Sequence, residues 1–259
     1  MKTSLQGRHA VVTGGSRGLG AAIARVLAAA GADVTIMGRT PAKLQLQVES
    51  IQGPGRAQAV RCDVSDAASV ARAFAEAHAA FGPVGILVNN AGEASAGPFQ
   101  QVALEDWQRL IGINLTGPFL CIQQVLPGMI SASLGTIVNI ASSAGVRGYG
   151  KAASYCASKH GVVGLTRALG AELARDGITV NALCPGYIDG TDMFHSAVDN
   201  VMKLTGKPLE DARAALAKGS PGGRLTSPDE VADAVVWLCS PVASQITGQA
   251  IAVPGREKL

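Results

Sequence analysis

The amino-acid sequence predicts an α/β fold in which a doubly wound parallel sheet carries helices on both faces. Short apolar segments rich in Val and Ile alternate with longer helical patterns along the chain. The apolar segments do not alternate strictly with polar residues, which is typical of strands covered on both faces. The chain has 259 residues, 47% of them hydrophobic, and this length and composition suit one domain with a full core.

Strands and helices are predicted to follow one another in strand–helix units through most of the chain. Such repeated units imply parallel strands joined by right-handed crossovers. Two helix starts carry further signals: Pro41 follows Thr40, and the segment 227–230 supplies a serine cap and two acids. The predicted strands are 9–13, 33–37, 57–62, 86–89, 136–140, 179–183 and 249–253. The predicted helices are 19–30, 41–51, 66–80, about 105–131, 153–175 and 228–239.

One stretch departs from this rhythm. Residues 187–222 follow Pro185-Gly186 and contain two helical pieces, 191–204 and 208–218, flanked by Gly and Pro. The stretch comes after the carboxyl end of a strand, where open α/β sheets bind ligands. We therefore expect a helical substrate lid inserted in a single domain of residues 1–259.

A glycine-rich turn lies between the first predicted strand and the first predicted helix. A turn of this kind lets the backbone approach a pyrophosphate at a helix N-terminus, where free N–H groups and the helix dipole favour an anion. The alternative is a plain strand–helix turn without a ligand. The pattern favours a dinucleotide site of the Rossmann type. The predicted contact residues in the turn are Gly14, Ser16, Arg17, Gly18, Leu19 and Gly20.

The end of the second strand indicates which dinucleotide is preferred. NAD-binding chains place an acid there, whereas NADP requires positive charge for its 2′-phosphate. This chain has Arg39 and no acid, and Arg17 and Ser16 in the turn can reach the same place. The sequence therefore predicts NADPH, with a solvated surface role for Arg39 as the alternative. Asp63 and Val64, at the end of the third strand, are further predicted cofactor contacts. Asp63 can accept a hydrogen bond from the adenine amino group, with a role in capping the loop as the alternative.

Tyr155 and Lys159 are four residues apart in a predicted helix and so share one face. A phenol beside an ammonium is suited to acid–base catalysis. Taken singly, each residue is better explained by packing or by a surface contact than by catalysis. Together with the glycine-rich turn, the pair favours an oxidoreductase.

The ordered set of motifs resembles the short-chain dehydrogenase/reductase family over nearly the whole chain. The motifs are Thr13-Gly14-x-x-x-Gly18-x-Gly20, Asn89-Asn90-Ala91-Gly92, Ile113-Asn114-Leu115, Asn139-Ile140-Ala141-Ser142, Tyr155-x-x-x-Lys159 and Pro185-Gly186. The resemblance implies a catalytic tetrad of Asn114, Ser142, Tyr155 and Lys159. It also implies that Asn90, Ala91 and Gly92 close the adenine-ribose side, and that Pro185, Gly186 and the backbone of Ile188 face the nicotinamide.

The resemblance implies a role for each tetrad member. Tyr155 is the proton donor in reduction and the base in oxidation, although a free phenol has a pKa of ~10. Lys159 stabilises the phenolate and binds the nicotinamide ribose. Ser142, with Ser143 as its local competitor, hydrogen-bonds the substrate oxygen. Asn114 kinks its helix and holds a water that links Lys159 to solvent.

Two positions depart from the family pattern. Gly190 displaces Thr191 by one place from the usual nicotinamide-contacting threonine. Pro254-Gly255-Arg256 stands where the last strand usually ends in Gly-Gly, near an expected subunit interface.

The substrate is suggested by a further resemblance. The segments 206–210 and 223–232 look like those of bacterial 3-oxoacyl-thioester reductases, which implies reduction of a 3-oxoacyl thioester or another β-keto compound. The alternatives are a free ketone, diketone, sugar or steroid alcohol as substrate, or an NADPH-binding sensor without turnover. Candidate apolar lid residues are Tyr187, Met193, Phe194, Val198, Met202 and Leu204, and candidate phosphate-binding cations are Lys203, Lys207, Arg213 and Lys218.

Composition argues against several other classes. The net charge is only +3, with no Lys/Arg cluster for nucleic acid, and we find no apolar run of the ~20 residues that span a bilayer. The five cysteines are scattered and odd in number, which indicates free thiols in a reducing cytoplasm. No His/Cys/Asp cluster has metal-ligand spacing, so no metal is expected. The family resemblance implies a homotetramer assembled through the helices at about 105–131 and 153–175.

Overall fold

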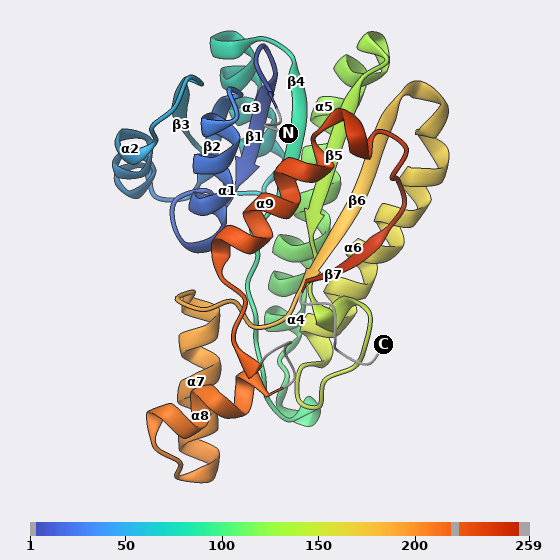
Figure 1. Ribbon diagram of the computed structural model, residues 1–259. Coiled ribbons are helices and arrows are strands. Elements are labelled where there is room, and N and C mark those ends of the chain that lie inside the picture. Colours follow the sequence, from blue (N-terminus) through green and yellow to red (C-terminus); the bar gives the residue numbers. More distant parts are fainter. Residues whose placement is uncertain (1–3, 219–222, 254–259) are drawn as a thin grey trace.

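The computed structural model of the protein describes residues 4–218 and 223–253, and its centre is a parallel sheet. The described strands lie in the order β3-β2-β1-β4-β5-β6-β7, and every neighbouring pair is parallel. The predicted doubly wound α/β fold is confirmed (Figure 1). The strands are β1 His9–Thr13, β2 Asp33–Gly38, β3 Ala57–Arg61, β4 Val84–Asn89, β5 Gly135–Ile140, β6 Ile178–Pro185 and β7 Ala250–Val253.

Helices connect the strands close to the predicted positions. The helices that follow strands are α1 Gly18–Ala29, α2 Pro41–Ser50, α3 Ala67–Phe81, α4 Leu104–Ile111, α5 Gly117–Ala132, α6 Ala153–Glu172 and α9 Pro228–Leu238. The predicted helix over about 105–131 is confirmed as the continuous helical stretch Leu104–Ala132, in which a π-helical turn at Gly112–Thr116 lies between α4 and α5. The wider turn accommodates the buried side chain of Asn114, which hydrogen-bonds outside its own helix.

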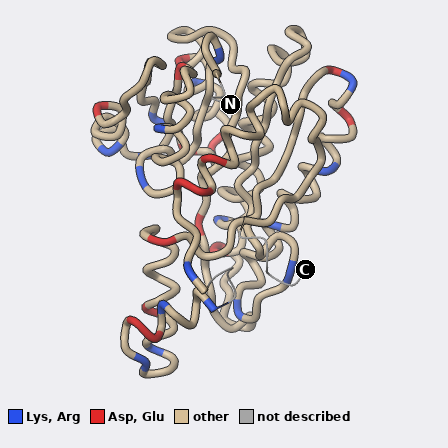
Figure 2. Tube along the Cα trace, in the orientation of Figure 1, with Lys and Arg blue, Asp and Glu red and all other residues tan. Residues whose placement is uncertain are grey.

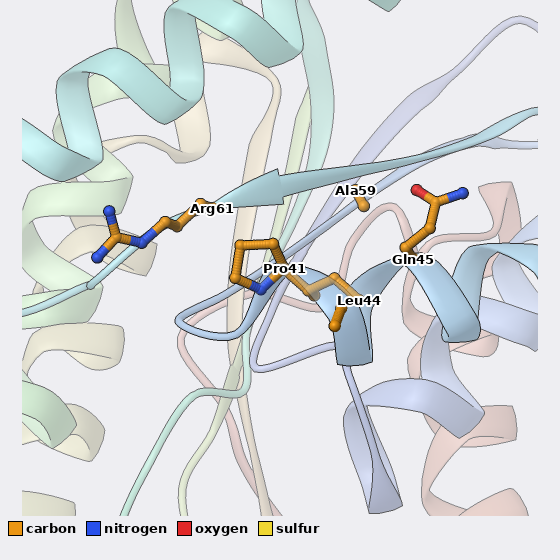
Figure 3. Close-up of a pocket in the computed structure, with 6 residues that line it drawn as sticks. Pro41, Leu44, Gln45, Ala59 and Arg61 are labelled. Carbon is orange, nitrogen blue, oxygen red and sulfur yellow. The ribbon is translucent and has the colours of Figure 1, made fainter.

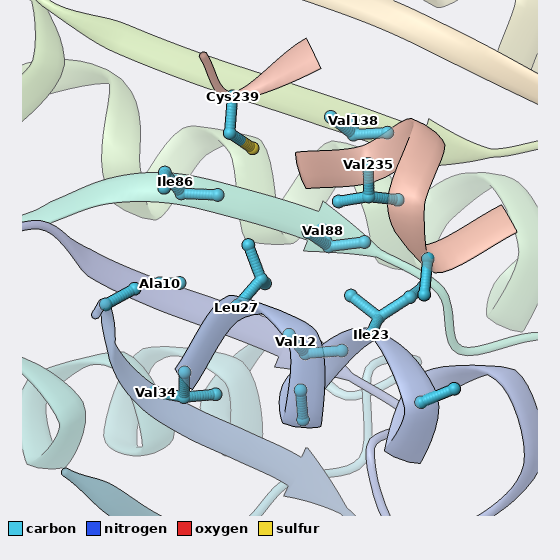
Figure 4. Packing of buried hydrophobic residues seen from close by; sticks show 14 of the residues in the cluster. Ala10, Val12, Ile23, Leu27, Val34, Ile86, Val88, Val138, Val235 and Cys239 are labelled. Atoms are coloured by element: carbon cyan, nitrogen blue, oxygen red, sulfur yellow. The ribbon is translucent and has the colours of Figure 1, made fainter. Parts of the chain in front are cut away.

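Two large apolar clusters cover the two faces of the sheet. Successive strand residues point to opposite faces, so Ala10 and Val12 belong to one cluster and Val11 to the other. The first cluster packs α1 and α9 on the sheet through residues such as Ile23 and Val235 (Figure 4). The second cluster packs α3 and α5 on the opposite face. The strand ends are thereby held in a fixed arrangement on which a site can be built.

The predicted start of α9 is confirmed as a capping box. The Ser227 hydroxyl accepts from the backbone N–H of Glu230, and the Glu230 carboxylate accepts from the backbone N–H of Ser227. Arg224 forms an ion pair with the same carboxylate. The pKa of Glu230 is lowered to about 2, first by the Arg224 guanidinium and then by the Ser227 backbone. The cap fixes where the chain enters α9.

The two helices α7 Asp192–Thr205 and α8 Leu209–Ala217 project from the body of the molecule (Figure 1). They bury a small apolar cluster of their own, centred on Phe194, Val198 and Ala212. The last four residues of the predicted lid, 219–222, lie outside the described residues. Lys and Arg are interspersed with Asp and Glu in these two helices and over the body (Figure 2).

The helical stretch Leu104–Ala132 is long and apolar enough to cross a membrane by length and composition. This differs from our expectation that the chain holds no such run. Within it, Cys121, Ile122, Val125 and Met129 are buried in the second apolar cluster. A core helix of this kind passes the same test, so the stretch is accounted for by its packing against the sheet.

Candidate functional site

The glycine-rich turn leaves the carboxyl end of β1 and enters α1. Gly14 and Gly18 have φ of +67° and +53°, values that favour glycine. A Cβ atom on Gly14 would lie 2.9 Å from the Ala91 Cα atom, and one on Gly20 would lie 2.2 Å from the Gly14 carbonyl oxygen. Both positions therefore require glycine for close backbone packing.

Asn90 ties this turn to the end of β4. Its side-chain Nδ2 donates to the carbonyl oxygens of Thr13 (3.0 Å) and Gly14 (3.2 Å). The backbone N–H groups of Asn90 and Ala91 both donate to the Thr13 hydroxyl. Since β1 lies between β2 and β4, these bonds stabilise the point where the order of strands reverses. Ligands of doubly wound sheets bind in the crevice at this point.

The N-terminus of α1 fits the pyrophosphate of a dinucleotide. The residue before the helix, Arg17, makes no side-chain cap, and the first turn holds no acidic residue. The free N–H groups and the positive end of the helix dipole are therefore open to an anion. Leu19 is buried in the first apolar cluster, so only its backbone faces the turn.

Both arginines that were predicted to bind a 2′-phosphate have acidic partners. Arg39 follows β2 directly and its Nη2 lies 3.2 Å from Oε1 of Glu93. Arg17 Nη1 lies 2.5 Å from Oδ2 of Asp192, at the start of α7. Sequence reasoning missed both acids, although Glu93 stands directly after the Asn90-Ala91-Gly92 motif, which was a signal that could have drawn attention to it.

Asp63 serves the loop that follows β3. Its Oδ1 accepts from the backbone N–H (3.0 Å) and the hydroxyl (2.6 Å) of Ser65, and the Ser65 hydroxyl is the main cause of a lowered Asp63 pKa. These bonds favour the loop-capping alternative that the sequence left open. Val64 is buried against Gly117 at the start of α5.

The structure brings Tyr155 and Lys159 together on α6, beside the end of β5. The Lys159 ammonium donates to the Ile140 carbonyl oxygen (2.8 Å) and lies 5.8 Å from the centre of the Tyr155 ring. Burial raises the pKa of Tyr155 to about 12, while a hydrogen bond with Ser142 opposes the rise. Burial also lowers the pKa of Lys159 to about 8.

The expected stabilisation of the phenolate by Lys159 stays a prediction. The phenol is protonated at neutral pH, since its pKa lies above its ordinary value of 10. Lys159 remains largely charged at neutral pH because its pKa lies above 7. The protonated phenol suits a proton donor.

Ser142 and Ser143 have different partners. The Ser142 hydroxyl accepts from the backbone N–H of Ala144 (3.1 Å) and hydrogen-bonds with Tyr155. The Ser143 hydroxyl lies 2.7 Å from the Tyr149 hydroxyl. The geometry therefore favours Ser142 over Ser143 as the tetrad serine.

Asn114 is buried and hydrogen-bonds Glu93 and Ser158. Its Oδ1 accepts from the Glu93 N–H (2.9 Å), and its Nδ2 donates to the Glu93 carbonyl oxygen (2.8 Å) and to the Ser158 hydroxyl (3.0 Å). A Cβ atom on Gly92 would lie 3.2 Å from Asn114 Oδ1 and 3.5 Å from Lys159 Nζ. The Asn114 amide and the Lys159 ammonium thus both lie close to the Gly92 backbone.

The start of the predicted lid contacts Tyr155. The Tyr155 hydroxyl donates to the Met193 sulfur at 3.7 Å. Thr191 caps α7, since its hydroxyl accepts from the Phe194 N–H and donates to the Ile188 carbonyl oxygen. The displaced Thr191 therefore has a structural role here. Gly186, at the end of β6, donates its N–H to the Val253 carbonyl oxygen (2.9 Å).

The candidate substrate-binding residues of the lid divide into two groups. Phe194 and Val198 are buried between α7 and α8, whereas Met193 and Leu204 are exposed. Arg213 pairs with Asp189 and stacks on Phe194, so it stabilises the lid internally. Of the predicted cations, Lys203, Lys207 and Lys218 are exposed. The predicted departure at 254–256 lies outside the described residues.

A shallow hollow of about 330 Å³ lies at another part of the sheet, between α2 and the edge strand β3 (Figure 3). It shares no residue with the predicted tetrad or cofactor contacts. Its lining residues are Pro41, Ala42, Leu44, Gln45, Ala59 and Arg61.

Comparison with known proteins gives matches along almost the full chain. A family model described as short chain dehydrogenase matches residues 8–201. A 3-oxoacyl-(acyl-carrier-protein) reductase of Aquifex aeolicus is 38% identical, over 98% of this chain and 99% of the relative. A D-threitol dehydrogenase of Mycolicibacterium smegmatis is also 38% identical, over 97% of this chain and 93% of the relative. The crystal structure of an actinorhodin polyketide ketoreductase variant with NADPH is similar with a TM-score of 0.92 and 40% identity, covering 98% of each chain.

Proposed function

Because this chain belongs to the short-chain dehydrogenase family, we propose that it is an NADPH-dependent reductase of a 3-oxoacyl thioester or a similar β-keto compound. The observation that carries the proposal is the group formed by Ser142, Tyr155 and Lys159 at the carboxyl end of β5. A protonated phenol, a charged ammonium and a hydroxyl meet there, beside a turn that fits a dinucleotide. When bound, the cofactor supplies hydride to the substrate carbonyl carbon.

The residues of this chain handle the proton. Tyr155 donates its hydroxyl proton to the substrate oxygen in reduction and accepts it in oxidation. Ser142 donates a hydrogen bond to the same oxygen as negative charge develops. Lys159, held by the Ile140 carbonyl, supplies positive charge within the site. Asn114 and Lys159, whose polar atoms both lie close to Gly92, would hold the water that restores the proton from solvent.

The preference for NADPH rests on Arg17 and Arg39. Arg17 is exposed in the glycine-rich turn, and Arg39 is exposed at the end of β2. NAD-binding chains carry an acid at the position after β2. The similar ketoreductase structure contains NADPH, which supports the same cofactor here. The predicted contacts at Ser16, Gly186 and Ile188 belong to this proposal.

A thioester substrate is favoured by the similarity to the 3-oxoacyl reductase. The second candidate is a free alcohol or ketone, which is favoured by the equally similar D-threitol dehydrogenase. In either case residues 187–222 act as the substrate lid, since Met193 contacts the Tyr155 hydroxyl.

We also propose a homotetramer in the reducing cytoplasm. All five cysteines lie in the described part of the chain and are buried free thiols, which supports a reducing compartment. The exposed apolar side chains of Phe119 and Ile130 on α5 support assembly through that helix.

An assay with NADPH and acetoacetyl-CoA tests the function. We expect the wild type to reduce acetoacetyl-CoA, and Tyr155→Phe to lower kcat by ~100-fold or more because the proton donor is lost. NADPH binding to the variant should stay within a few-fold of wild type, which separates chemistry from binding. If the enzyme reduces simple ketones but not acetoacetyl-CoA, the thioester substrate is rejected. If it binds NADPH but reduces no carbonyl compound, the alternative of an NADPH-binding sensor is supported.

A further inference from the structure

Glu93 holds a carboxylate between two arginines that come from different parts of the chain. One oxygen lies 3.2 Å from Arg39 Nη2, and the other forms an ion pair with Arg109 of α4. Arg39 follows β2 and Glu93 follows β4, and β1 lies between these strands. The Arg39–Glu93 pair therefore spans the carboxyl end of β1, at the point where the strand order reverses and a dinucleotide binds.

The position of Glu93 is fixed by the tetrad. Its backbone N–H donates to Asn114 Oδ1 and its carbonyl oxygen accepts from Asn114 Nδ2. The side chain of Glu93 is 30% exposed, compared with 64% for that of Arg39. The arginine is thus the more exposed partner, and it is the group that a ligand from solvent can reach.

We propose that Glu93 is a specificity-determining residue that competes with the 2′-phosphate of NADPH for Arg39 and so limits the preference for NADPH over NADH. This inference rests on the proposed NADPH-dependent function. A carboxylate and a phosphate are alternative ligands for the same guanidinium fork. Arg39 must leave Glu93 to bind the phosphate, and the carboxylate then remains near a second negative charge.

Arg109 makes this exchange possible. It stays paired with Glu93 when Arg39 leaves, so the carboxylate is not left without a cation. NADH carries a ribose hydroxyl in place of the 2′-phosphate, and it can bind while the Arg39–Glu93 pair stays closed. The competition therefore weakens NADPH binding and leaves NADH binding almost unchanged.

Binding titrations of NADPH and NADH, followed by cofactor fluorescence without substrate, test the inference. Glu93→Gln should lower the dissociation constant of NADPH about fivefold, which is the effect expected for a partly exposed ion pair. It should change the dissociation constant of NADH less than twofold. The gain should shrink in high salt, which screens charges. Arg109→Gln should weaken NADPH binding, because Glu93 then loses the pair with Arg109 and holds Arg39 more strongly.

Glu49→Gln is the matched control, since it makes the same substitution at an exposed carboxylate of α2 that accepts from the Gln45 side chain. It should leave the NADPH/NADH ratio of affinities unchanged. An unchanged ratio in both Glu93→Gln and Arg109→Gln would overturn the inference. Arg39→Asp tests the proposed cofactor preference separately: if it leaves the ratio unchanged, the assignment of Arg39 to the 2′-phosphate fails, whatever the Glu93 variants do.

Discussion

At the scale of one residue, the buried ammonium of Lys159 lowers the stability of the folded protein. Its ammonium is buried, with the Ile140 carbonyl as its hydrogen-bond acceptor. Burial disfavours the charged form and lowers the pKa of Lys159 from 10.5 to about 8. A group that suits proton transfer is thus kept in a place that opposes its charge.

The stability of Lys159→Met is expected to depend on pH. Between about pH 8 and 10.5 the folded wild type binds fewer protons at Lys159 than the unfolded chain, so its stability rises with pH in this window. The variant lacks this rise. It should be more stable than wild type at pH 7, by at most ~3 kcal/mol, and lose this advantage towards pH 10.

Urea unfolding at pH 7 and pH 10 measures this difference. Lys43→Met removes an exposed lysine and serves as the control, with no pH-dependent difference from wild type. A constant difference between wild type and Lys159→Met at both pH values would contradict the burial of a titrating ammonium.

At the scale of elements, most strands and helices could be predicted from local sequence signals. The turn at Gly14–Gly20 and the spacing of Tyr155 and Lys159 are properties of neighbouring residues, so the strand, turn and helix could be recognised. The bonds of Asn114 to Glu93 and Ser158 join segments distant in the sequence, and the π-helical turn that accommodates them could not be predicted from helical periodicity. The same limit applies to the Arg17–Asp192 and Arg39–Glu93 pairs.

The capping box of α9 gives a prediction at this scale. Ser227→Ala removes the hydroxyl that accepts from Glu230, and should lower the free energy of unfolding by about 1 kcal/mol. Ser227→Asp should restore most of the loss, because aspartate accepts the same bond. Urea unfolding of both variants measures the effect. An unchanged stability of Ser227→Ala would show that the cap contributes nothing, and an equal loss in both variants would show that the bond accepted from Glu230 is not the cause.

For the whole molecule, the buried thiols set the behaviour at high pH. Burial raises the pKa of Cys62 to about 11 and that of Cys239 to about 12, and it also raises those of Cys121 and Cys184, all from 9.0. These thiols stabilise the fold fully below pH 9, where they are protonated in both states. Above pH 9 they ionise only on unfolding, and stability is lost until the folded pKa is passed.

The free energy of unfolding should therefore fall between pH 9 and 11. Each fully ionised thiol of the unfolded chain contributes ~1.4 kcal/mol per pH unit, so Cys62, Cys121 and Cys239 together outweigh the opposite effect of Lys159. Urea unfolding under reducing conditions measures the fall, and Cys239→Ala should show a shallower one. A variant that loses stability with pH as steeply as wild type would contradict the assignment to Cys239.

The separate cluster of α7 and α8 has a consequence for how such proteins diverge. Phe194, Val198 and Ala212 pack with one another and contribute nothing to the two large clusters on the sheet. Mutations in this small cluster leave the two sheet clusters intact, whereas mutations at Asp192 or Met193 also change contacts of Arg17 and Tyr155. Related chains can thus diverge in the packing between these two helices while they keep the same sheet and its supporting layers.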